Sequence, residues 1–122
     1  MYTPKTYKDL IFWKKSIENT KILLSLMKKI HKSPANSIII NQLLRSLMSI
    51  GANIAEGYGR FGGKEFTRFL HVSLGSANES DYWLLLLKEN NPSFSREIEK
   101  IIESNTEVIK MLAKSLKTLR NK

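Results

Sequence analysis

Apolar residues recur at spacings of three and four along most of the chain, which predicts helices and no strands. The expected helices cover residues 7–31, 38–56, 64–88 and 93–119, each to within a few positions. Short links containing Pro, Gly and Asn separate them. This pattern predicts an all-α fold, an up-down-up-down antiparallel four-helix bundle, with residues 1–122 forming a single domain.

The apolar spacing also predicts which faces are buried. In the first helix the expected core stripe is Leu10, Trp13, Ile17, Thr20, Leu24 and Met27. In the fourth, Ile98, Ile102, Asn105, Ile109, Leu112, Leu116 and Leu119 keep a four-three repeat, in which Asn105 could fix the register. Residues 83–87 are apolar on all sides of the third helix, which favours a second buried face and therefore a homo-oligomer.

Several residues match the chemistry of helix ends. Thr6 followed by Asp9 predicts a capping box at the start of the first helix. Gly57 or Gly59 is expected to end the second helix in the left-handed conformation. Ser93 or Ser95 is expected to cap the fourth.

One polar stripe interrupts the broad apolar surface of the second helix: Gln42, Arg45, Ser49, Asn53 and Glu56. Arg45 and Glu56 are separated by about 16 Å along the axis, so each needs a partner on another helix or chain. Glu79 of the third helix is a candidate to pair with this stripe. We interpret these residues as a polar network inside the bundle or between subunits, in which Glu56→Ala damages assembly or stability. The alternative is a ligand or phosphate site built from the same residues.

Composition limits the function classes. The chain has no cysteine, so disulfides, thiolate metal sites and cysteine nucleophiles are excluded. No apolar run reaches the length of a membrane span, and the N-terminus lacks the apolar segment of a signal peptide. We therefore expect a cytoplasmic protein that does not bind membranes.

A net charge of +9 favours a polyanionic partner such as RNA or DNA. Candidate nucleic-acid-binding residues lie near the termini and in the second link: Lys8, Lys14, Lys15, Arg60, Lys64, Lys114, Lys117 and Arg120. The alternative is a charged surface that contacts only solvent. In the fourth helix the acidic residues come first and the basic residues last, and the helix dipole also favours this order, so the charge distribution does not require a polyanionic partner.

The remaining motifs point away from catalysis and cofactors. Residues 57–62 match G-x-G-x-x-G, but a helix rather than a strand precedes them, which argues against a dinucleotide site. Neither His31 nor His71 follows a Glu by three positions, so no di-metal site is expected. Nothing in the sequence combines a nucleophile, a base and an orienting group. We therefore expect a non-enzyme that needs neither metal nor cofactor.

Several segments together resemble one family. They are QLLR at 42–45, SIGANIAEGYGR at 49–60, KEFTRFL at 64–70 and GSANE at 75–79, preceded by Lys8-Asp9-Leu10 and Trp13. Over about residues 7–87 the chain resembles the bacterial four-helix-bundle family, also called the 23S rRNA intervening-sequence protein family.

The resemblance implies a bacterial cytosolic bundle that forms a ring-like homopentamer and has no established enzyme activity. Some members are encoded within rRNA genes, and relatives are accessory proteins of the reverse transcriptases of diversity-generating retroelements, where they bind nucleic acid. Many members carry basic residues where this chain has Leu44 and Leu74. These departures leave the terminal basic clusters as the better nucleic-acid candidates.

Two functions follow as hypotheses. The first is a non-catalytic homo-oligomer that binds RNA or DNA through basic surfaces. The second is a protein–protein adaptor or accessory subunit, for example of a reverse transcriptase, with no nucleic-acid role of its own.

Overall fold

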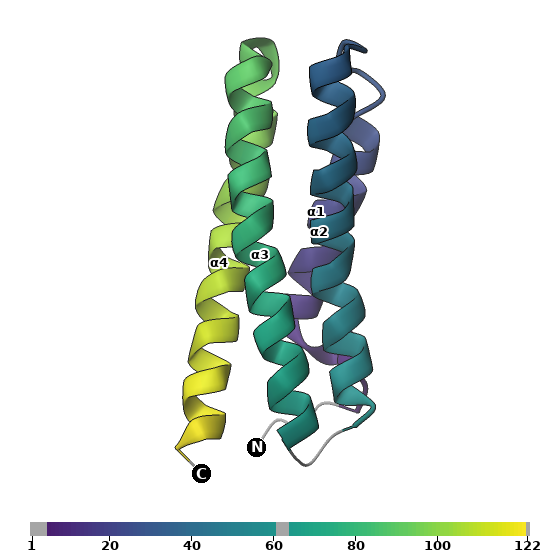
Figure 1. Ribbon diagram of the computed structural model, residues 1–122. Helices are drawn as coiled ribbons and strands as arrows, with labels where there is room; N and C mark the ends of the chain where they lie inside the picture. Colours follow the sequence, from purple (N-terminus) through teal and green to yellow (C-terminus); the bar gives the residue numbers. More distant parts are fainter. Residues whose placement is uncertain (1–4, 61–63, 122) are drawn as a thin grey trace.

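Four long helices run alternately up and down, with both termini at one end (Figure 1). The computed structural model describes residues 5–60 and 64–121. In chain order the elements are the 3₁₀ turn η1 (Tyr7–Asp9), α1 (Ile11–Leu26), α2 (Pro34–Tyr58), α3 (Lys64–Asn90), the 3₁₀ turn η2 (Pro92–Phe94) and α4 (Ser95–Arg120). Each helix packs against the next, and α1 also packs against α4. The predicted all-α, up-down-up-down bundle is confirmed.

The first helix is shorter than predicted at both ends. Thr6 and Asp9 do form the capping box, but it closes the η1 turn. Leu10 then takes an extended conformation (φ −74°, ψ 127°) before α1 begins. At the other end α1 stops at Leu26, and the Ile30 N–H bonds back to the Leu26 carbonyl at 3.3 Å in a closing turn. The spacing of apolar residues continues through both breaks and therefore does not reveal them.

The second helix starts earlier than predicted. The Ser33 hydroxyl accepts a hydrogen bond from the Asn36 N–H at 3.1 Å and caps α2. Pro34 occupies the first turn, where no intrahelical N–H bond is required of it. The proline that suggested a link is thus part of the helix start.

Two predicted caps differ from the structure. Gly59 is the C-cap of α2, one of the two expected positions, but its φ of −65° is right-handed and not left-handed; Gly57 lies inside the helix. Ser95 is the first residue of α4 and not its cap, and the preceding Phe94 makes no side-chain capping bond. Neither glycine therefore adopts the left-handed conformation.

The core is a column of aliphatic side chains from α2, α3 and α4, and the buried face of α4 largely follows the predicted stripe. Fully buried side chains include Leu43, Leu47, Ile50, Ile54, Leu70, Leu84, Leu87, Ile98, Ile101, Val108 and Leu112. Asn105 is also buried, and its amide donates to the Ala77 carbonyl at 2.9 Å. This bond ties the middle of α4 to α3.

The buried face of α1 differs from the prediction. The buried residues are Phe12, Ser16, Asn19, Leu23 and Leu26, whereas the predicted stripe is half-buried or exposed. The two stripes are one residue apart, a rotation of about 100°. The prediction failed because the true core face carries two polar residues, which lower its apparent hydrophobicity. Ser16 is accommodated because its hydroxyl donates to the Trp13 carbonyl at 2.9 Å.

Within the described residues, α2 meets the length and composition of a membrane span. The same measure is met by core helices of bundles, and α2 supplies much of this core. It also carries Gln42 and Arg45, which contact α3 or one another. The length and composition of α2 are therefore weak evidence for a membrane span.

Candidate nucleic-acid interface

Serine side chains line the contact between α2 and α3. The Ser80 hydroxyl lies 2.8 Å from that of Ser46, and Ser76 donates to Ser49 at 2.9 Å. Ser73 donates to a backbone carbonyl of α2 at 2.9 Å. Small side chains allow close approach of the helices, and their hydroxyls are satisfied within the chain.

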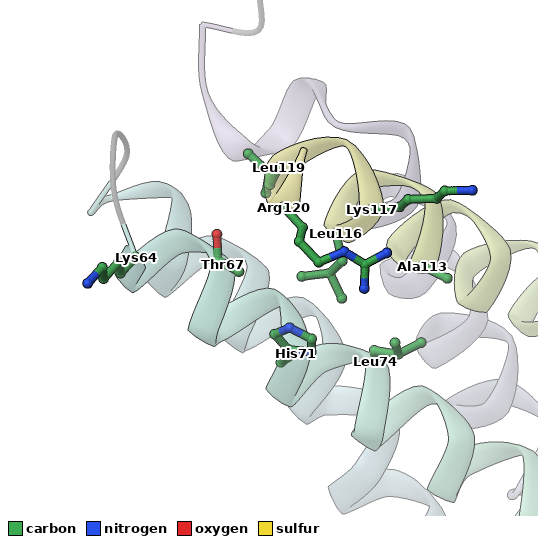
Figure 2. A pocket seen from close by; sticks show the side chains of 9 residues that line it. All are labelled: Lys64, Thr67, His71, Leu74, Ala113, Leu116, Lys117, Leu119 and Arg120. Carbon is green, nitrogen blue, oxygen red and sulfur yellow. The ribbon is translucent and has the colours of Figure 1, made fainter. Parts of the chain in front are cut away.

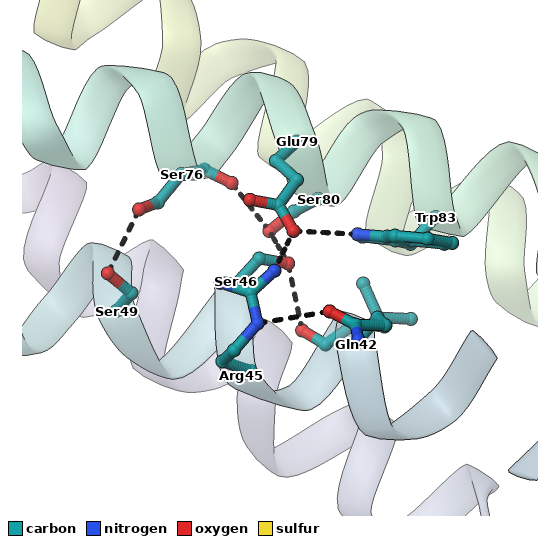
Figure 3. A network of polar contacts seen from close by, with 9 residues as sticks. Gln42, Arg45, Ser46, Ser49, Ser76, Glu79, Ser80 and Trp83 are labelled. Carbon is teal, nitrogen blue, oxygen red and sulfur yellow. Dashed lines mark hydrogen bonds and ion pairs between the residues drawn. The ribbon is translucent and has the colours of Figure 1, made fainter. Parts of the chain in front are cut away.

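A charged group spans the outer edge of the same contact (Figure 3). Arg45 forms an ion pair with Glu79, and its Nε donates to the Gln42 side chain at 3.1 Å. Trp83 Nε1 donates to the same Glu79 carboxylate at 2.8 Å. These groups are satisfied by one another, which disfavours the alternative of a phosphate site built from them.

The rest of the predicted polar stripe stays on α2. Asn53 Nδ2 donates to the Ser49 carbonyl at 2.8 Å and to its hydroxyl at 2.9 Å. Glu56 pairs with Arg60 at 3.0 Å, one helical turn later, and each side chain is 54% exposed. The expectation that Glu56 has a buried partner on another helix is therefore wrong for the single chain.

Gly57 is buried where α2 meets α3. A Cβ placed there would lie 2.6 Å from the Cβ of Phe69, closer than real Cβ contacts allow. Above this contact the guanidinium groups of Arg60 and Arg68 lie 5.6 and 4.6 Å from the centre of the Phe69 ring. Gly57 thus allows α2 and α3 to pack closely at Phe69. The Phe69 ring in turn contacts the guanidinium groups of two arginines.

The end of the bundle that contains both termini gathers the candidate basic residues, and we call it the basic end (Figure 1). They lie in η1 (Lys8), near the start of α1 (Lys14, Lys15), after α2 (Arg60), at the start of α3 (Lys64) and in the last turns of α4 (Lys114, Lys117, Arg120). They converge because α1 and α3 begin where α2 and α4 end. The topology thereby joins clusters that are far apart in sequence.

Some of these candidate basic residues form ion pairs within the chain and others do not. Lys15 is paired with Glu107 of α4 at 2.7 Å, and Arg60 with Glu56. Among residues 5–60 and 64–121, no ion pair is formed by the others: Lys8, Lys14, Lys64, Lys114, Lys117 and Arg120. These cations are the ones available to an external anion.

The acids near this end are held ionised by close partners. A hydrogen bond from Arg68, reinforced by its charge, lowers the pKa of Glu65. Lys15 lowers the pKa of Glu107 in the same way. Hydrogen bonds from two backbone N–H groups lower the pKa of Asp9. At neutral pH these carboxylates are committed to contacts within the chain.

A groove with a cavity volume of about 720 Å³ opens between α3 and α4 at the basic end (Figure 2). We call it the α3–α4 groove. It is lined by Lys64, Thr67, His71, Leu74, Ala113, Leu116, Lys117, Leu119 and Arg120. Figure 2 shows the Arg120 side chain extending from α4 over Leu116 toward Ala113, with His71 on α3 at the other side of the groove. The described residues that line it combine an aliphatic floor with cationic side chains and include no carboxylate.

The opposite end is closed by side-chain amides, and we call it the amide end. Asn36 Nδ2 donates to the His31 carbonyl at 2.8 Å and to Asn91 Oδ1 at 3.1 Å. Asn91 Nδ2 returns a bond to Asn36 Oδ1 at 2.8 Å and also donates to the Leu87 carbonyl at 2.9 Å. Asn90 adds a third bond to Asn36 at 3.0 Å. These buried amides join the link before α2 to the link before α4.

No group of three or more His, Asp or Glu residues in the described parts of the chain is arranged to hold a metal ion. His31 lies at the amide end and His71 beside the α3–α4 groove. The two histidines therefore occupy opposite ends of the molecule.

The family model of the 23S rRNA-intervening sequence protein matches residues 8–114. This chain belongs to that family. A solved structure, described as a protein of unknown function from the S23 ribosomal protein family of Bacteroides thetaiotaomicron, is 31% identical with a TM-score of 0.74. The match covers 88% of this chain and 99% of the other. A comparison with curated proteins finds no match. The resemblance seen in the sequence is confirmed, and neither finding indicates a catalytic family.

Sequence reasoning missed the groove. The sequence marks Leu74 only as a departure from the basic residue of many relatives, and His71 only as a histidine without the spacing of a di-metal site. In the structure both line the groove opposite Ala113 and Leu116 of α4. His71 and Leu74 are three residues apart on α3, as are Ala113 and Leu116 on α4, so each pair shares one helix face. An up-down bundle also makes α3 and α4 neighbours. Their relative register, however, has no signature in the sequence.

Proposed function

We propose that this chain is a non-catalytic, self-associating helix bundle of the bacterial cytoplasm that binds nucleic acid, RNA or DNA, through its basic end. The observation that supports this most is the set of cations there without a carboxylate partner among the described residues. Lys64, Lys117 and Arg120 surround one groove. Phosphate is the anion that a net charge of +9 would attract most strongly.

The physics of this binding is counterion release. Each phosphate neutralised by Lys or Arg frees condensed cations, so affinity falls as salt rises. Three such contacts predict a slope of log K against log salt of about −2 to −3. Contacts of this kind tolerate changes in sequence, because phosphates carry no base information.

The test uses fluorescence anisotropy with a labelled 15-nucleotide RNA at 50 and 200 mM salt. The triple variant Lys64→Ala/Lys117→Ala/Arg120→Ala should bind at least tenfold more weakly, with a shallower salt slope. The matched control is Lys28→Ala/Lys29→Ala/Lys32→Ala, which removes the same charge from exposed positions near the amide end. Equal losses in both variants, or no binding by the wild type at 50 mM salt, would refute the proposal.

Self-association is supported by large apolar side chains that the single chain leaves exposed. On α2 and α3 they are Ile38, Met48, Val72, Tyr82 and Leu85. Burying such residues in contacts between copies removes apolar surface from water. We propose a homopentamer, in line with the family resemblance. Light scattering should give a mass about five times that of the chain, and Leu85→Glu should lower it; a monomeric wild type would contradict the proposal.

The same exposed residues support a second candidate, a protein–protein adaptor or accessory subunit, for example of a reverse transcriptase. In that case the apolar face binds a different protein and the basic charge has no direct role. A protein partner recovered equally with and without nuclease treatment, together with no RNA or DNA binding by the pure chain, would favour this function over the first.

A further inference from the structure

We propose that the α3–α4 groove receives an unpaired nucleobase, so that the bundle prefers single-stranded to duplex nucleic acid. This inference rests on the proposed nucleic-acid function and specifies the form of nucleic acid that the site takes. It is carried by the shape of the groove and by the residue types that line it.

The shape favours a ligand that enters the protein. A cavity of about 720 Å³ lies within the usual range of ligand pockets, roughly 300–1,000 Å³. Its floor is aliphatic, with Leu74 on one side and Ala113 and Leu116 on the other. A phosphate backbone bound on the surface would leave this floor in contact with water. An unstacked base would cover it.

Two planar groups lie in the same groove. The His71 imidazole projects from α3, and the Arg120 side chain extends into the groove from α4 (Figure 2). Imidazole and guanidinium planes are groups on which proteins stack unpaired bases. His71 is exposed, so its ring is free to contact a ligand.

The positive charges beside the groove favour one position for the phosphate backbone of a bound nucleic-acid strand. Lys64 lies at one end of the groove, and Lys117 lines it from α4. Neither pairs with a described carboxylate. A strand with one base in the groove can therefore place its flanking phosphates near these ammonium groups. In a duplex the bases are stacked and paired, so only the phosphates could be contacted.

The experiment compares a fluorescein-labelled 15-nucleotide oligouridine with the same strand in a 15-base-pair RNA duplex, at one salt concentration. The wild type should bind the single strand at least tenfold more tightly. His71→Ala should weaken single-strand binding roughly tenfold and leave duplex binding unchanged. His71→Phe, which keeps a planar ring, should restore the preference. His31→Ala, an exposed histidine at the amide end, is the matched control and should change neither.

The outcomes separate the two proposals. Equal affinity for both RNAs, or equal weakening of both by His71→Ala, overturns the base-binding site while nucleic-acid binding stands. Absence of binding to either RNA overturns both. Displacement of the oligouridine by polyglutamate at equal or lower charge concentration would show that the groove recognises acidic peptide and would also overturn the base-binding site.

Discussion

Both ends of the bundle are made of helix termini and short links, but they use polar groups in opposite ways. At the amide end, Asn36 and Asn91 are buried and exchange hydrogen bonds. At the basic end, Lys64, Lys117 and Arg120 border an open groove and pair with no described carboxylate. The two amides are satisfied within the chain, whereas these three cations are exposed to solvent.

This difference teaches that stability and binding are separated along the length of the molecule. A buried amide that is fully hydrogen-bonded stabilises the fold, and losing its partner is costly. An exposed ammonium group stays hydrated at little cost and can exchange water and counterions for phosphate. Changes at the amide end should therefore alter unfolding, and changes at the basic end should alter affinity.

The largest expected effect comes from Asn36→Ala at the amide end. The Asn91 Oδ1 atom, in a buried side chain, would lose the donor seen at 3.1 Å. We expect the free energy of unfolding to fall by about 2–3 kcal/mol, measured by urea denaturation, with RNA affinity unchanged. Asn41→Ala, at an exposed position of the same helix, is the control and should cost less than about 0.5 kcal/mol. A loss in Asn36→Ala as small as that expected for Asn41→Ala would show that the amide network contributes little.

Ala113→Glu would give a cation of the basic end a partner within the chain, as the polar groups of the amide end already have. Ala113 is exposed in the α3–α4 groove, and a carboxylate there lies one helical turn before Lys117. We expect RNA affinity to fall roughly tenfold at 0.1 M salt, with stability changed by less than about 0.5 kcal/mol. Ala113→Gln has a similar size without the charge and controls for filling of the groove. Undiminished binding by Ala113→Glu would place the RNA elsewhere.

Glu56→Ala should have a small effect. Its ion pair with Arg60 is half exposed and lies within one helix, a class worth about 0.3–0.5 kcal/mol. Thermal unfolding should change little, and release of Arg60 should slightly raise RNA affinity. A fall in the oligomer mass, measured by light scattering, would instead show that a second copy buries Glu56.

Acid should produce the smallest effect. The folded-state pKa values of Glu107, Glu65 and Asp9 are lowered, so these groups stabilise the fold above the ordinary carboxyl pKa. This contribution is lost as pH falls through the lowered values. Between about pH 5 and pH 3 the melting temperature should drop less in Glu107→Gln than in the wild type. Glu103→Gln, at an exposed position without an ion pair to any described residue, is the control. An equal drop in wild type and Glu107→Gln would contradict the expected role of the Lys15 pair.

Periodicity predicted most of the fold because helix formation and amphipathic packing repeat over many residues. It succeeded for α4, where Ile98, Leu112 and Leu116 are buried as expected. It failed for α1, where the buried Ser16 and Asn19 made a neighbouring stripe look more apolar. The Ser16 hydroxyl is compensated by its hydrogen bond to the Trp13 carbonyl, whereas Asn19 Nδ2 has no hydrogen-bond partner among the described residues; an apolar count registers neither.

The helices, their order, the family and the excess of positive charge can be predicted from the sequence, because they follow from local spacing, motifs and composition. Which charges are paired within the chain and which face a groove is visible only in the folded molecule. Arg45 and Lys15 form ion pairs with carboxylates on neighbouring helices, whereas Lys117 and Arg120 pair with no carboxylate among the described residues. The reason is geometric: pairing depends on the rotation and register of packed helices, and a shift of one residue turns a side chain by about 100°.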